Sequence, residues 1–232
     1  FFNKKQPTPY DEAVNLMWYL ENILYHSIGN IYNFIEREIF DGEYDSDNPF
    51  IELGFWPGGD RDGNPYVNAA TTLKVAEALR SAIIVCYYRD VRKLVRRLTF
   101  SGVDAMIHSL EEQLYENVFG PKEHKRITTK ELLQQLNDMR SLMIDRHHSL
   151  FIQRLDSLIH KIKIFGTHFA TLDIRQDSRI HTQVLLDING ALKAKGLPAV
   201  LPDNYTSLAD EHKIDILSSL EAGLDPSILP DG

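Results

Sequence analysis

The stretch TTLKVAEALRSAIIVCYYRDVRKLVRRL, residues 71–98, decides the fold class of this chain. Neither glycine nor proline interrupts it, and its apolar side chains recur every three or four residues, at Leu73, Ala76, Leu79, Ile83, Tyr87, Val91, Leu94 and Leu98. This spacing places the apolar side chains on one face of a single long α-helix. A helix with one apolar face packs against further helices, so the stretch predicts a mainly α protein.

The same periodicity continues on both sides of this stretch. Toward the N-terminus, Thr8-Pro9-Tyr10-Asp11 combines a hydroxyl cap, a proline and an acid, and predicts the start of a long helix that ends before Asp41. Toward the C-terminus, we expect helices over residues 103–118, from the capping box Thr128-x-x-Glu131 onward, over 150–164, from Ser178 to about Lys195, and from Ser207-x-x-Asp210 onward.

Two short segments predict β-strands. Residues 51–56 (IELGFW) are mostly apolar and lie between prolines, and residues 169–174 (FATLDI) have side chains that β-structure accommodates. Two strands do not form an independent sheet with a protected core, so we expect further strands that this sequence does not supply. The predicted fold is therefore mainly α, with long helices and two short strands from a larger β element.

Composition and charge exclude several classes of protein. The chain has 232 residues, of which 25 are basic and 33 acidic, and its net charge is −8. This balance argues against a nucleic-acid binder, and no apolar run approaches the ~20 residues of a membrane span. Cys86 is the only cysteine, which excludes an internal disulfide, suits a reducing compartment and, in an apolar stretch, predicts an inert core thiol. We expect one mostly helical region over residues 1–232.

The loop at residues 58–65 (GGDRDGNP) follows the first predicted strand and is the most unusual segment of the chain. A calcium-loop interpretation fails because Gly63 is at the fourth position and Thr71 at the twelfth, where glycine at the sixth and glutamate are required. A phosphate-loop interpretation fails because no Gly-Lys-Ser/Thr closes the loop. Two alternatives remain, a ligand site after a strand or a structural turn held by internal Asp–Arg pairs.

A second candidate lies in residues 172–178 (LDIRQDS), where Arg175 follows a predicted strand and precedes a predicted helix. A guanidinium in this place is a suitable clamp for a carboxylate or phosphate group, and the amides of the helix start add to it. The alternative is a structural ion pair of Arg175 with Asp173, Asp177 or another acid.

Three further features have simpler interpretations. The acidic run over residues 41–47 resembles a calcium loop but has Ser46 where glycine is needed, which indicates a solvated loop. His147 and His148 are adjacent on a predicted helix and point about 100° apart, which favours helix-end residues over a metal site. The basic residues of the long helix indicate a solvated face or the partner of an acidic helix; they are Arg89, Arg92, Lys93, Arg96 and Arg97.

Three segments together resemble the phosphoenolpyruvate carboxylase family. They are residues 7–13 (PTPYDEA), residues 56–65 (WPGGDRDGNP) and residues 172–178 followed by His181-Thr182, and they occur in the order that the family has. The middle motif is long and very specific. This sequence departs from the family pattern at Pro57, Asn68 and Asp177, and Arg179-Ile180 stands where the family tends to have Arg directly before the His.

The resemblance implies a reaction and a set of site residues. The family carboxylates phosphoenolpyruvate with bicarbonate to give oxaloacetate and phosphate, and it requires Mg²⁺ or Mn²⁺. Arg175 matches the substrate-binding Arg of the family, and Trp56 matches a Trp of the apolar wall beside the substrate methylene. The signature loop matches at Gly58, Gly59, Asp60, Arg61, Asp62 and Asn64, which we expect to shape the floor of the site, with the two aspartates orienting the guanidinium.

The resemblance also implies that the 232 residues are a fragment of a larger enzyme. The catalytic His, the metal carboxylates and the mobile Arg-Gly-Gly loop of the family do not occur in this sequence, so we expect the fragment alone to be inactive and to hold no metal. The two strands would be staves of an incomplete α/β barrel. The intact enzyme is expected to be a cytoplasmic homotetramer that contacts neither nucleic acid nor membrane. The alternative is a non-catalytic helical interaction or regulatory module that retains the signature loop.

Overall fold

A computed structural model describes residues 7–40, 51–62, 64–121 and 125–220. The chain divides into two compact units, Phe1–Ile174 and Arg175–Gly232, and each is described by itself. Both units are built mainly from helices, and the described residues contain only two short strands. The mainly α fold class is therefore confirmed, while the single region over residues 1–232 stays a prediction.

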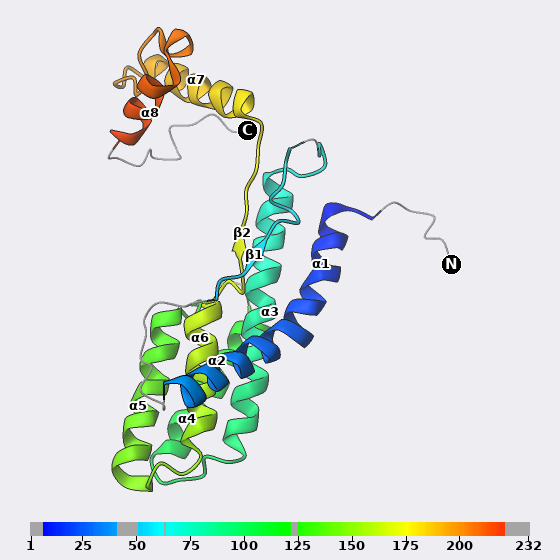
Figure 1. The fold of residues 1–232 in the computed structure, drawn as a ribbon, viewed down its shortest axis with the longest axis vertical. Coiled ribbons are helices and arrows are strands. Elements are labelled where there is room, and N and C mark those ends of the chain that lie inside the picture. Colours follow the sequence, from blue (N-terminus) through cyan, green and yellow to red (C-terminus); the bar gives the residue numbers. More distant parts are fainter. Residues whose placement is uncertain (1–6, 41–50, 63, 122–124, 221–232) are drawn as a thin grey trace. The chain divides into compact units, whose positions relative to one another are not determined.

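The first predicted helix is present as a continuous helical rod (Figure 1), divided into α1 (Pro9–Tyr19), the π-helical turn η1 (Leu20–Leu24) and α2 (Tyr25–Ile39). Its start is the predicted one, because the Asp11 backbone N–H donates to the Thr8 hydroxyl and the Asp11 carboxylate accepts from the Thr8 backbone N–H. The periodicity did not predict the π-helical turn. The acidic run at 41–47 lies outside the described residues.

Four helices form a bundle in the first unit, namely α3 (Ala69–Val95), α4 (Val103–Phe119), α5 (Thr129–His147) and α6 (Ile152–Phe165). The rod packs on this bundle, α1 against α3 and α2 against α6 (Figure 1). Along α3 the predicted core face is buried from Leu79 to Leu94. Cys86 is buried there as well, so its predicted place in the core is confirmed, and burial raises the pKa of its thiol to about 12.

The first two turns of α3 differ from the predicted pattern. Leu73 is 67% exposed and Ala76 is exposed as well, whereas Thr72 and Val75 are buried. The helical period continued backward from Leu79 reaches Val75 and Thr72, while Leu73 lies one position further round the helix. The apolar character of Leu73 therefore misled the prediction, and the true inner face at this end of α3 carries a hydroxyl.

The two strands are β1 (Gly54–Phe55) and β2 (Thr171–Leu172), and they pair with each other in parallel. The Thr171 N–H donates to the Leu53 carbonyl and the Asp173 N–H to the Phe55 carbonyl, both at 2.8 Å. Both strands are shorter than predicted, because only Phe55 of β1 is buried and no further strand among the described residues extends the pairing. The barrel that the resemblance implies stays a prediction.

The second unit consists of α7 (Ser178–Ala194), the short 3₁₀ turn η2 (Tyr205–Ser207) and α8 (Asp210–Ser218). Two hydrogen bonds join the buried Asn189 side chain to the backbone of Leu201 and fix the connection after α7. The predicted cap at Ser207 is wrong, because Ser207 belongs to η2 and α8 begins at Asp210 without a side-chain cap. Among the described residues, no helix has the combination of length and apolarity that crossing a bilayer requires.

The capping box of α5 gives a testable stability prediction. The Thr128 hydroxyl accepts from the Glu131 N–H, and the Glu131 carboxylate accepts from the Thr128 N–H at 2.9 Å. Thr128→Ala removes this cap and is expected to lower the free energy of unfolding by about 1 kcal/mol. Urea denaturation followed by circular dichroism measures this, and Thr128→Ser, which keeps the hydroxyl, is expected to match the parent chain.

The same box predicts a pH dependence. Hydrogen bonds from Lys125 and Thr128 lower the pKa of Glu131 to about 2. Because the pKa of Glu131 is lower in the folded chain than its value of about 4.3 in the unfolded chain, the ionised carboxylate stabilises the fold at a pH above 4.3. This contribution is lost as the pH falls from there toward 2. The difference in the free energy of unfolding between the parent chain and Glu131→Gln should therefore shrink over this window, and a constant difference would contradict the assignment.

Candidate functional site

The signature loop begins with a tight turn directly after β1. The N–H groups of Gly59 and Asp60 both donate to the Trp56 carbonyl, at 2.9 and 3.1 Å. Gly58 has a φ of +81°, and a Cβ there would lie 2.5 Å from Val75 Cγ2 of α3. A Cβ on Gly59 would lie 2.0 Å from the Asp173 carbonyl oxygen after β2. The turn therefore fits only without side chains, between α3 and the end of β2.

Thr72 of α3 holds the loop in this place. Its hydroxyl donates to the Gly58 carbonyl at 2.7 Å and accepts from the Arg61 guanidinium (Nη2) at 3.2 Å. Sequence reasoning missed this residue because the more apolar Leu73 next to it dominated the pattern. The sequence did contain one indication of the correct inner face, namely Asn68, whose side chain caps α3 and fixes where its first turn begins.

Arg61 is bound to α3 rather than to its neighbouring acids. Among the described residues no ion pair joins it to Asp60 or Asp62, so the turn is not held by the internal Asp–Arg pairs that one alternative predicted. Its Nε is buried without a hydrogen-bond partner. The aspartate and asparagine side chains instead shape the backbone, because Asp60 accepts from the Asp62 N–H and Asn64 from the Tyr66 N–H.

The end of β2 brings the second candidate segment against the first. The contact between Gly59 and the Asp173 carbonyl joins two motifs that lie far apart in the sequence. Trp56, the residue directly after β1, is 53% exposed. Arg175 is exposed and is the first residue of the second unit, which is described by itself.

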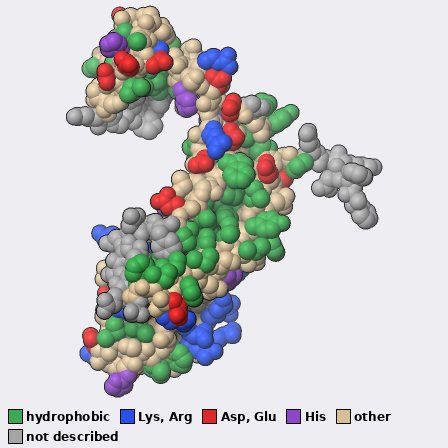
Figure 2. All heavy atoms as spheres, viewed as in Figure 1, with side chains coloured by type: hydrophobic (Ala, Val, Ile, Leu, Met, Phe, Trp, Pro, Cys, Tyr) green, Lys and Arg blue, Asp and Glu red, His purple; other side chains and the backbone are tan. Residues whose placement is uncertain are grey.

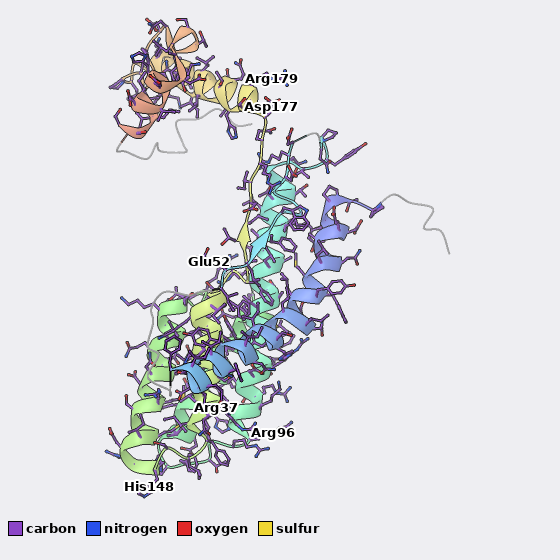
Figure 3. The ribbon with its side chains drawn as sticks, viewed as in Figure 1. Arg37, Glu52, Arg96, His148, Asp177 and Arg179 are labelled. Atoms are coloured by element: carbon purple, nitrogen blue, oxygen red, sulfur yellow. The ribbon has the colours of Figure 1, made fainter. Side chains whose placement is uncertain are left out.

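The start of α7 accounts for two residues that departed from the family pattern. Asp177 caps the helix, because its carboxylate accepts from the Arg179 N–H at 2.8 Å. The Arg179 guanidinium also binds this carboxylate, at 2.6 and 3.0 Å, and these hydrogen bonds lower the pKa of Asp177 to about 2 (Figure 3). Asp177 is therefore paired with Arg179, two residues further along the chain.

The weaker candidates have structural roles. His147 stacks on Phe100 and its Nε2 lies 3.1 Å from the Ser101 carbonyl, while His148 ends α5 in the left-handed conformation. In the basic patch, Arg89 pairs with Glu21 of η1 and Arg92 with Glu111 of α4, each at 3.6 Å. The interpretation of His147 and His148 as helix-end residues is therefore confirmed. Arg89 and Arg92 pair with acids of neighbouring helices, as one of the two interpretations of the basic residues predicted.

The described residues do not fit a divalent metal ion. No three His, Cys, Asp or Glu side chains within them lie close enough together to hold one.

Together, the helical bundle and the parallel strand pair form a mainly α scaffold that holds the glycine turn between α3 and the end of β2. The sequence model of the family described as phosphoenolpyruvate carboxylase matches residues 1–129 and 108–224. Since these matches cover nearly the whole chain, the chain belongs to the phosphoenolpyruvate carboxylase family.

Curated relatives carry the same name. The chain is 24% identical to a phosphoenolpyruvate carboxylase of Gloeobacter violaceus, with 91% of this chain and 28% of that protein covered. It is 26% identical to that of Thermosynechococcus vestitus (88% and 25% covered) and 28% identical to that of Roseiflexus castenholzii (92% and 28% covered). The chain therefore spans about a quarter of the length of these relatives.

Proposed function

We propose that the intact protein to which this chain belongs is a phosphoenolpyruvate carboxylase. In this reaction a bicarbonate oxygen attacks the phosphorus of phosphoenolpyruvate, and the bond from phosphorus to the enol oxygen breaks. Carboxyphosphate then releases CO₂ and phosphate, and the enolate carbon bonds to the CO₂ to give oxaloacetate. The observation that carries the proposal is the contact of Gly59 with Asp173, which joins two family motifs at the ends of paired strands.

Two residues receive substrate roles in this proposal. Arg175 binds the anionic groups of phosphoenolpyruvate, since a guanidinium forms paired, charge-assisted hydrogen bonds with phosphate or carboxylate. Trp56 forms an apolar wall that keeps water from protonating the enolate, and its exposure after β1 leaves it available for this. The loop residues Gly58, Gly59, Asp60, Arg61, Asp62 and Asn64 shape the floor of the site, and none of them transfers a proton.

The rest of the catalytic machinery is proposed to lie outside residues 1–232. It comprises the general-base His and the ligands of Mg²⁺ or Mn²⁺, which supplies positive charge where charge develops on the substrate. The net charge of −8 is compatible with an anionic substrate, because a few placed arginines set the local potential. The intact enzyme is proposed to be a homotetramer of the cytoplasm.

A coupled assay tests this proposal. Oxaloacetate formation, followed with malate dehydrogenase, is expected for the protein expressed from the complete reading frame and not for the 232-residue chain. Activity of the short chain would refute the prediction that it is an inactive part. Inactivity of the complete, folded protein with Mg²⁺ and Mn²⁺ present would favour the non-catalytic helical module instead.

A further inference from the structure

A cavity is lined by residues of α2, α3 and α6. Its residues on α3 are Asp90, Lys93 and Leu94, and Figure 1 shows that this end of α3 lies away from the signature loop. Its volume is about 360 Å³, within the range of small-molecule sites. Thr72, which anchors the loop, and Asp90, which lines the cavity, are separated by ~27 Å along the helix axis, at 1.5 Å per residue. The cavity is therefore distinct from the candidate site at the signature loop.

Cations outnumber anions in the lining of this cavity. Lys93, Arg154 and Lys161 carry positive charge, and Asp90 is the only acid among the lining residues. The ammonium groups of Lys161 and Lys93 donate to different oxygens of Asp90, at 2.8 and 2.9 Å, and the Tyr25 hydroxyl donates at 2.9 Å. Asp90 is thus fully engaged, and the lining keeps a net positive charge.

The ionisation of Asp90 supports a net positive charge in the lining. Burial alone would raise the pKa of its carboxyl, but the hydrogen bonds from Lys161, Lys93 and Tyr25 outweigh burial and lower the pKa. Asp90 is therefore ionised at neutral pH and neutralises one ammonium group. The charge of the other lysine and that of Arg154, which forms no ion pair with a described residue, remain unbalanced.

The lysines retain capacity to bind a further group. Each ammonium has three protons and donates one to Asp90. Lys161 is 91% buried and is held in place by the Tyr25 ring, whose centroid lies 4.4 Å from its Nζ. Ser157, also in the lining, accepts from the Asn33 amide at 2.8 Å, and its hydroxyl retains a proton that it can donate.

The surface around this end of α3 carries more positive charge. Figure 2 shows Lys and Arg side chains gathered over the end of α3 that lies away from the loop, and Figure 3 places Arg96 at this end. Arg96 and Arg97 form no ion pair with a described residue, whereas Arg89 and Arg92 pair with Glu21 and Glu111. A concentration of one sign of charge beside a cavity raises the local concentration of oppositely charged ligands. The cavity and its surroundings therefore favour the same kind of ligand.

We propose that the α2–α3–α6 cavity binds a small multivalent anion that carries phosphate or carboxylate groups. Lys161 and Lys93 bind one anionic group beside Asp90, Arg154 binds a second at the rim, and the Ser157 hydroxyl donates between them. This inference concerns residues 33–161 alone and does not depend on the carboxylase reaction or on its substrate.

Isothermal titration calorimetry of the 232-residue chain tests the proposal, with inorganic pyrophosphate and citrate as probes and sodium chloride at equal ionic strength as the reference. Saturable one-to-one binding of at least one probe is expected. Binding of pyrophosphate alone would assign the site to phosphate compounds, and binding of citrate alone to carboxylates. If neither probe binds more strongly than chloride, the proposal is overturned.

Charge variants locate the binding. Arg154→Glu and Lys93→Met change exposed side chains, and each is expected to weaken probe binding about tenfold or more. The matched controls are Arg96→Glu, at the same end of α3 but outside the lining (Figure 3), and Lys130→Met on α5, and both are expected to retain most of the affinity. Equal losses in the variants and their controls would show that binding follows net charge, and would refute the cavity as the site.

Discussion

Gly59→Ala is expected to lower the free energy of unfolding of the first unit by about 3 kcal/mol, at the upper end of what overpacking costs. The added Cβ would lie 2.0 Å from the Asp173 carbonyl oxygen and 3.0 Å from its carbonyl carbon. These are backbone atoms, so no side chain can move aside. Relief requires a shift of the segment after β2, whose Asp173 N–H bonds the Phe55 carbonyl, and that shift weakens the strand pair.

Tryptophan fluorescence during urea denaturation measures this effect, because both tryptophans, Trp18 and Trp56, lie in the first unit. Gly190→Ala is the matched control. No atom lies within 4 Å of the position of its Cβ, and the residue is inside α7 of the second unit, where alanine is expected to stabilise the helix by ~0.5–1 kcal/mol. An unchanged fluorescence midpoint for Gly59→Ala would refute the close contact between loop and strand.

Arg175→Ala in the intact enzyme is expected to lower kcat/KM for phosphoenolpyruvate by about 100-fold or more. The proposed role gives the guanidinium two charge-assisted hydrogen bonds to an anionic substrate, and removal of one donor at a site of developing charge typically costs this much. Arg175→Lys keeps the charge but not the planar guanidinium, so its kcat/KM is expected to lie between those of the parent enzyme and Arg175→Ala. Steady-state kinetics of all three proteins measures the effect.

Arg179→Ala is the matched control for Arg175→Ala. Its guanidinium binds Asp177 at the first turn of α7, so its loss is expected to affect that helix end and to leave kcat/KM near the parent value. Unchanged kcat and KM in Arg175→Ala would refute the substrate role of Arg175. A loss in Arg179→Ala as large as that in Arg175→Ala would show that the start of α7, and not one guanidinium, is what the reaction needs.

Local sequence signals were sufficient for most of the helices. The periodicity of residues 71–98 predicted α3, and capping residues predicted the starts of α1 and α5, because the cap and its partner are only three residues apart. The predictions failed where the structure of a segment depends on residues that are distant in the sequence. Ser207 resembles a cap but lies in η2, and both strands are shorter than their apolar runs because strand length depends on what pairs with them.

By itself, the sequence determined a mainly α fold, a buried Cys86 and the motifs that indicate the family, since each depends on residues close together in the chain. Only the tertiary structure decided what holds the signature loop. Thr72, Val75 and the Asp173 carbonyl each act through van der Waals contacts or hydrogen bonds to a turn distant in sequence. The cavity depends likewise on Lys161 reaching Asp90, since a buried ion pair forms only when packing brings α6 against α3.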